Sequence, residues 1–148
     1  MKKYILTLIL LLPLLARADF TTLSTEKVQA KIAQGVTVID IRRDEEFKQY
    51  GIIPKSHKLT FFNKKGRYNA PKWLKSFAKI VPNKDTPFIL VCAHANRTKI
   101  LGRFLSEQGY KNVSELAGGI NYGWIDKGLS TVKTAGKDGK NKPWYKFW

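Results

Sequence analysis

Two short apolar runs, VTVIDI at 36–41 and PFILV at 87–91, place the strongest constraint on the fold of this chain. The first is rich in β-branched residues, and both are nearly continuous, which is the pattern of strands buried on both faces. A last strand is expected near 113–116, where apolar residues stand only at the two ends. Strands that alternate with helices predict an α/β fold, a parallel sheet with helices on both faces.

Helical spacing and capping residues fill the stretches between these strands. Ser24 is suited to cap a first helix and Gly35 to end it. Helices are expected at 24–34, 44–49, 71–80, 97–108 and around Trp124. The apolar residues of the fourth helix recur at helical spacing and are expected to face the sheet; they are Ile100, Leu101, Phe104 and Leu105.

The chain begins like an exported protein. Lys2 and Lys3 precede an apolar run at 4–15, and small residues follow up to Ala18, which is the order of a secretory signal peptide. The alternative is an uncleaved membrane anchor, but the run is shorter than the roughly 20 residues of a spanning helix, and Pro13 interrupts it. We therefore expect residues 1–18 to be removed on export, to the periplasm of a bacterium.

The remaining chain is expected to form one domain, 19–131, followed by a basic aromatic tail, 132–148. The net charge is +16, and removal of the charged signal residues Lys2, Lys3 and Arg17 would lower it to +13. We do not expect nucleic acid as a partner, because the protein is predicted to be exported and has no zinc-finger or recognition-helix pattern. Lysines and terminal aromatics suit the tail for an anionic membrane surface or an acidic partner. The alternative is a strap that packs on its own domain.

Cys92 is the sole cysteine and ends the strand at 87–91, only a few residues before the next helix. Ligands of open α/β sheets bind beyond the carboxyl ends of the strands. Amides of the short loop, the helix N-terminus and Arg97 would all stabilise a thiolate there. The sequence thus favours a reactive thiol over the alternative, a buried structural cysteine.

With these motifs in order, the sequence from about residue 23 to 129 resembles the rhodaneses, a family of sulfurtransferases. The exported, single-domain form resembles the small periplasmic members of the phage-shock type. Three signatures carry the resemblance: Asp40-Ile41-Arg42 with Glu45-Glu46-Phe47, Cys92 with Arg97 five positions on, and Gly118-Gly119-Ile120 with Trp124 and Gly128-Leu129.

The resemblance implies sulfur transfer through a persulfide on Cys92. Sulfane sulfur would move from a small anionic donor, thiosulfate or a persulfide, to an acceptor thiol or to cyanide, with no cofactor and no metal. The substrate would be bound by the loop that follows the cysteine, namely Ala93, His94, Ala95, Asn96, Arg97 and Thr98. Asp40 and Arg42, at a strand end, would shape the rim of the site or, as the favoured alternative, hold the fold through an ion pair or through loop hydrogen bonds. Phe47 and Trp124 are expected in the core.

The loop departs from the usual family pattern Cys-Arg-Ser-Gly-Asn-Arg-Ser. Ala93 replaces an arginine and His94 a serine, while Ala95 stands where glycine would supply a backbone position with positive φ. Two other functions therefore stay open. One is a non-catalytic module that binds an anion or a partner. The other is phosphatase activity, as in the cell-division-cycle phosphatases of similar fold, although their loop is one residue longer.

Overall fold

The computed structural model describes residues 19–133, which form a five-stranded parallel sheet of order β1-β5-β4-β2-β3. Parallel strands require crossover connections, and helices supply most of them. The strands are β1 (Asp19–Leu23), β2 (Thr37–Asp40), β3 (His57–Lys58), β4 (Phe88–Val91) and β5 (Asn112–Leu116). Every residue of β4 is buried, as expected for a central strand covered on both faces.

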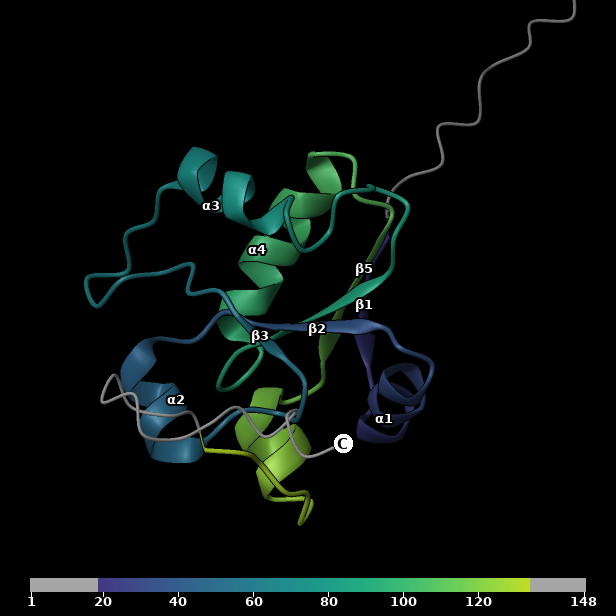
Figure 1. Ribbon diagram of the computed structural model, residues 1–148, viewed down its shortest axis with the longest axis vertical. Coiled ribbons are helices and arrows are strands. Elements are labelled where there is room, and N and C mark those ends of the chain that lie inside the picture. Colours follow the sequence, from purple (N-terminus) through teal and green to yellow (C-terminus); the bar gives the residue numbers. More distant parts are fainter. Residues whose placement is uncertain (1–18, 134–148) are drawn as a thin grey trace, which may run out of the picture.

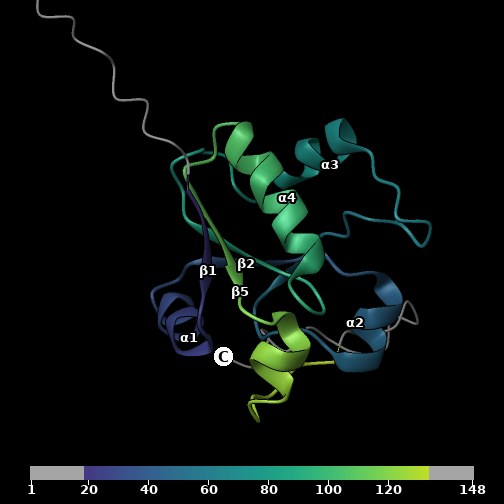
Figure 2. The same ribbon diagram turned by 180° about the vertical axis from the view of Figure 1, so that it is seen from behind.

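Helices cover both faces of the sheet. They are α1 (Thr25–Ala33), α2 (Asp44–Tyr50), α3 (Ala70–Phe77), α4 (Asn96–Glu107) and a π-helical turn, η1 (Asn121–Ile125). Figures 1 and 2 show α3 and α4 on one face and α1 with η1 on the other, while α2 lies near the carboxyl end of β2. The fold class predicted from the sequence is therefore confirmed.

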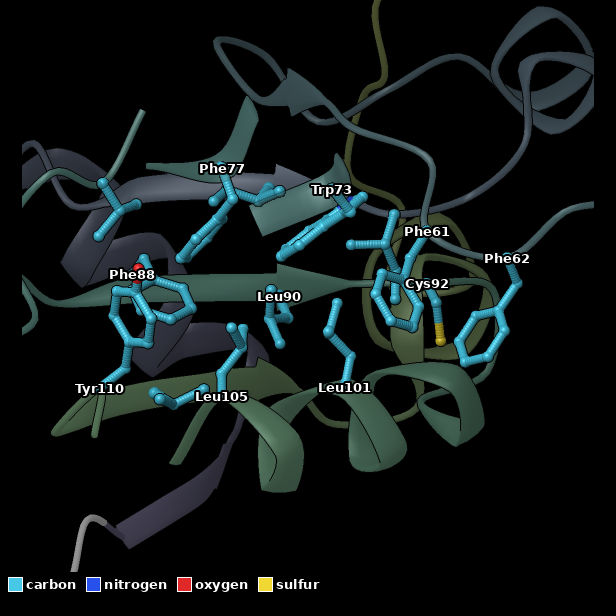
Figure 3. Close-up of a cluster of buried hydrophobic side chains, with 14 residues drawn as sticks. Phe61, Phe62, Trp73, Phe77, Phe88, Leu90, Cys92, Leu101, Leu105 and Tyr110 are labelled. Atoms are coloured by element: carbon cyan, nitrogen blue, oxygen red, sulfur yellow. The ribbon is translucent and has the colours of Figure 1, made fainter. Parts of the chain in front are cut away.

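Each face of the sheet has its own apolar core. On the α3–α4 face, aromatic residues gather around β4, and Trp73 stacks on Phe77 with 4.8 Å between ring centroids. Figure 3 shows this cluster extending from Tyr110 at one end to Cys92 and Phe62 at the other. The opposite core includes Val28 of α1 and Trp124 of η1. Phe47 and Trp124 are buried, as predicted.

The sequence did not reveal two strands, β1 and β3. β1 pairs with β5 at one edge of the sheet, and β3 consists of two exposed residues at the other. The expected inward position of Ile100 was wrong, because its side chain is 58% exposed. Thr98 and Gly102 face the sheet instead, and a Cβ atom on Gly102 would collide with the ring of Phe20.

Across residues 19–133 the structure contains no helix with the length and apolar character needed to span a bilayer. The predicted signal peptide, 1–18, and nearly all of the predicted tail, 132–148, lie outside the described residues. Export and tail contacts therefore stay predictions.

Candidate functional site

The loop after β4 connects Cys92 to α4 at the carboxyl end of the sheet. Ala95 is the N-cap residue of α4 and has left-handed backbone angles, φ 62° and ψ 7°. The sequence predicted this position with positive φ. Within residues 19–133, the backbone N–H groups of His94, Ala95, Asn96 and Arg97 donate no hydrogen bond to a protein acceptor. Consecutive amides around a left-handed residue form the kind of concave nest that binds anions.

A glycine pair supports the back of this loop. Ile120 N–H donates to Cys92 C=O at 2.8 Å, and Asn121 N–H donates to Ala93 C=O at 3.1 Å. A Cβ atom on Gly119 would lie 2.5 Å from both of those carbonyl oxygens. Glycine at position 119 of the Gly118-Gly119-Ile120 signature is therefore required by the close approach of two backbones.

Cys92 is almost fully buried, with 1% of its surface exposed. It belongs to the core cluster on the α3–α4 face, and in the view of Figure 3 its sulfur lies between the rings of Phe61 and Phe62. Its polar contact is with the hydroxyl of Thr98, at 3.6 Å between Sγ and Oγ1. The sequence favoured a reactive thiol over a buried structural cysteine. The structure shows that the thiol is buried, and its reactivity stays a prediction.

A buried carboxyl group, unnoticed in the sequence, lies behind Thr98. Glu115 of β5 is 0% exposed. Thr98 Oγ1 donates to Glu115 Oε2 at 2.5 Å, and Thr22 Oγ1 donates to Glu115 Oε1 at 2.8 Å. An acidic residue in a strand predicted to be buried on both faces was the available signal, since buried carboxyl groups are rare unless partnered. A hydrogen-bonded chain consequently runs from Cys92 through Thr98 to Glu115.

Arg97 pairs with a carboxylate and not with the sulfur. Its guanidinium donates to both carboxylate oxygens of Glu46 on α2, at 2.8 and 2.5 Å. The hydrogen bond to Glu46 and the charge of that carboxylate raise the pKa of Arg97, against the opposing effect of burial. Burial acts to raise the pKa of Glu46, but the hydrogen bonds and charges of Arg97 and Arg43 outweigh it, so this pKa lies below its usual range.

His94 is exposed and faces away from the core. Its Nε2 lies 3.0 Å from Asn121 Nδ2, and its ring centroid is 5.0 Å from that of Tyr122. The imidazole thus connects the loop to η1. Asn96 is also exposed, whereas Ala93 is partly exposed.

Asp40 and Arg42 form the buried ion pair that the sequence favoured. Arg42 Nε and Nη2 donate to both Asp40 oxygens at 2.7 to 3.0 Å, and Nη2 also donates to Gly51 C=O at 2.6 Å. Burial raises the pKa of Asp40, against the opposing effect of the hydrogen bonds from Arg42. This pair joins the end of β2 to the C-terminal end of α2.

The fold and the site together define an α/β protein with one cysteine at the carboxyl end of a central strand and an amide-lined loop before the next helix. Residues 24–126 match the Rhodanese-like domain family. The chain therefore belongs to the rhodanese family, as the sequence motifs predicted.

Individual relatives agree with this assignment. A rhodanese domain-containing protein of Drosophila melanogaster is 31% identical over 94 residues, which cover 62% of this chain and 84% of the relative. The thiosulfate sulfurtransferase GlpE of Haemophilus influenzae is 27% identical over 108 residues, 72% of this chain and 89% of GlpE. The crystal structure of a rhodanese-related protein from Thermoplasma volcanium superposes with a TM-score of 0.58 at 25% identity, covering 77% of this chain and 99% of the other.

Proposed function

We propose that this protein is a sulfurtransferase that carries sulfane sulfur as a persulfide on Cys92. The observation that carries the proposal is the position of Cys92 at the carboxyl end of β4, followed by four backbone amides of the loop and the start of α4 that have no protein acceptor. The similarity to GlpE, itself a thiosulfate sulfurtransferase, supports thiosulfate as a donor.

The reaction divides into two displacements. Cys92 thiolate attacks the outer sulfur of thiosulfate, the S–S bond of the donor breaks, and sulfite leaves with the bonding electron pair. The product is a persulfide anion, and the loop amides are suited to stabilise it and the oxygens of the donor. A thiolate acceptor, or cyanide in an assay, then removes the outer sulfur and regenerates the Cys92 thiolate.

A second candidate is a non-catalytic module that binds a small anion or a partner protein. Two observations favour it: Cys92 is buried, and the guanidinium of Arg97 is already paired with Glu46. The positive charge that the sequence assigned to the thiolate is therefore partly neutralised. Phosphatase activity has no comparable support, since the loop between Cys92 and Arg97 is one residue shorter than in the related phosphatases.

Turnover assays on the purified protein separate these functions. We expect thiocyanate formation from thiosulfate and cyanide, abolished in Cys92→Ser and retained in a surface control such as Lys72→Gln, and no hydrolysis of an aryl phosphate. Phosphate release without thiocyanate would contradict the proposal in favour of a phosphatase. If folded, fully reduced protein binds thiosulfate without turnover, the binding module is the better account.

A further inference from the structure

The buried carboxyl group of Glu115 lies two hydrogen bonds from the thiol, and sulfur transfer as proposed above does not use it. The hydroxyl of Thr98 connects them, 3.6 Å from Cys92 Sγ and 2.5 Å from Glu115 Oε2. Three segments supply the parts of this chain: the end of β4, the first turn of α4 and β5. All three side chains are at most 1% exposed, so bulk water is excluded from the path.

The hydrogen bonds determine how a proton can move. A threonine hydroxyl carries one hydrogen and two lone pairs. Because Thr98 donates its hydrogen to Glu115, its oxygen presents lone pairs to the Cys92 S–H group. The Oε1 atom of Glu115 accepts from Thr22 and is therefore occupied, which leaves Oε2 as the position for an incoming proton.

We infer that Cys92, Thr98 and Glu115 form a buried proton relay in which Glu115 takes up the thiol proton when the nucleophile is generated. The S–H bond breaks as its proton passes to Thr98 Oγ1, and the original hydroxyl proton of Thr98 passes to Glu115 Oε2. Thr98 is unchanged, and no electrons are gained or lost. Thr98 then donates to the thiolate, while the protonated carboxyl group donates to Thr98. Glu115 acts through Thr98 and is therefore a positioning residue rather than a catalytic one.

Other groups around the thiol do not supply this base. From α4, Arg97 is a cation paired with Glu46 of α2. Asp40, at the end of β2, is held by Arg42. From the side of β1, the group facing Glu115 is the neutral hydroxyl of Thr22.

The side chains that cluster with Cys92 in the core are hydrophobic, and the loop carries one histidine, which is exposed. The segment before α3 contributes the rings of Phe61 and Phe62. An imidazole can act as a base, but His94 is exposed and its Nε2 lies 3.0 Å from Asn121 Nδ2. It therefore requires a control variant.

The pH profile of alkylation tests the relay, because Cys92 is the only cysteine and iodoacetamide reacts with the thiolate. The alkylation rate of each variant is divided by its own plateau value at high pH, so that differences in the accessibility of Cys92 to the reagent cancel. Two groups that share a proton titrate in two macroscopic steps, so the wild-type profile should rise in a lower and an upper step. Thr98→Val and Glu115→Gln should lose the lower step, with normalised rates at pH 7 reduced about tenfold or more. Thr98→Ser should keep both steps.

A single step in the wild type would overturn the relay. The relay would also be contradicted if the lower step survived in Thr98→Val or in Glu115→Gln. Loss of the lower step in Thr98→Ser or in His94→Gln would contradict it too. The relay rests on the proposed function, since it generates the sulfur nucleophile, but alkylation does not require sulfur transfer. Sulfur uptake from thiosulfate, measured separately on wild type, decides that function. Two-step alkylation without uptake would contradict the proposed function and leave the relay standing.

Discussion

At the scale of single residues, Ala95 holds a left-handed backbone conformation that glycine adopts at lower cost. A non-glycine residue in this region is strained by roughly 1–2 kcal/mol. Replacing Ala95 by glycine would relieve this strain. Glycine also increases the entropy of the unfolded chain, which offsets about 0.4–1 kcal/mol of the stability gained. We therefore expect Ala95→Gly to raise the free energy of unfolding by about 0.5–1 kcal/mol in urea denaturation.

Ala93 provides the matched control, since it lies in the same loop but does not have positive φ. Ala93→Gly should lower the free energy of unfolding, because only the entropy of the unfolded chain changes. Equal effects of the two substitutions would show that the conformation of Ala95 carries no strain.

The sequence predicted some residues of the site well and missed others for physical reasons. A loop alanine replacing glycine indicated positive φ, and the position of Asp40 and Arg42 at a strand end indicated an ion pair or loop hydrogen bonds. Arg97 was expected beside the sulfur, yet it pairs with Glu46, because a carboxylate on α2 lies within reach only once the chain is folded. Glu115 was missed, since its partners Thr22 and Thr98 are remote in the sequence.

At the scale of elements, Gly119 sets how closely the segment before η1 approaches the Cys92 loop. Gly119→Ala combines positive φ with a collision against two carbonyl oxygens. We expect it to lower the free energy of unfolding by about 2–4 kcal/mol, in the range of other overpacking and strain effects.

Gly128→Ala separates these two causes. Gly128 also has positive φ, 76°, but no atom lies within 4 Å of a Cβ built there. Gly128→Ala should therefore lower the free energy of unfolding by only about 1 kcal/mol, through backbone strain alone. If Gly119→Ala and Gly128→Ala lose the same free energy of unfolding, measured by heat or urea, then the collision with the two carbonyl oxygens is not the reason for glycine at position 119.

The ion pair of Glu46 with Arg97 connects α2 to α4 and should make stability depend on pH. The pKa of Glu46 is lowered in the folded state, so its contribution is complete above the unfolded value of about 4.3 and is lost as pH falls through the folded value. Glu46→Gln should cost about 1 kcal/mol at pH 7 after allowance for solvent screening, because glutamine can still cap α2. The difference from wild type should vanish in acid.

Glu45→Gln is the control for this effect. Glu45 is exposed and pairs with Lys64 at the surface, so its substitution should leave stability nearly unchanged. A Glu46→Gln defect that persists undiminished in acid would mean that packing, and not charge, joins α2 to α4.

Elements with long apolar patterns were predicted to within a few residues, whereas short edge elements were not. The helix expected at 97–108 is observed as α4, Asn96–Glu107, and the strand at 87–91 as β4. β3 has two exposed residues and no apolar pattern to detect. β1 is polar in its middle, and its pairing with β5 depends on contacts remote in the sequence.

At the scale of the whole molecule, the strong positive charge and the basic aromatic end of the chain predict attraction to anionic surfaces. We expect protein spanning residues 19–148 to co-sediment with vesicles that contain anionic lipid, and to do so less as salt increases. A form that ends at residue 132 should lose this binding. Equal sedimentation of the two forms would assign the attraction to the domain and not to the tail.

Sulfur bound to Cys92 can be detected in the intact mass of the reduced protein after incubation with thiosulfate. A persulfide adds one sulfur atom, about 32 Da, and a chain with one cysteine has no second thiol to discharge it. We expect this added mass in wild type, its removal by cyanide, and no addition in Cys92→Ser. Folded, reduced wild-type protein that gains no sulfur from thiosulfate or from persulfide donors would contradict the proposal that Cys92 carries sulfur.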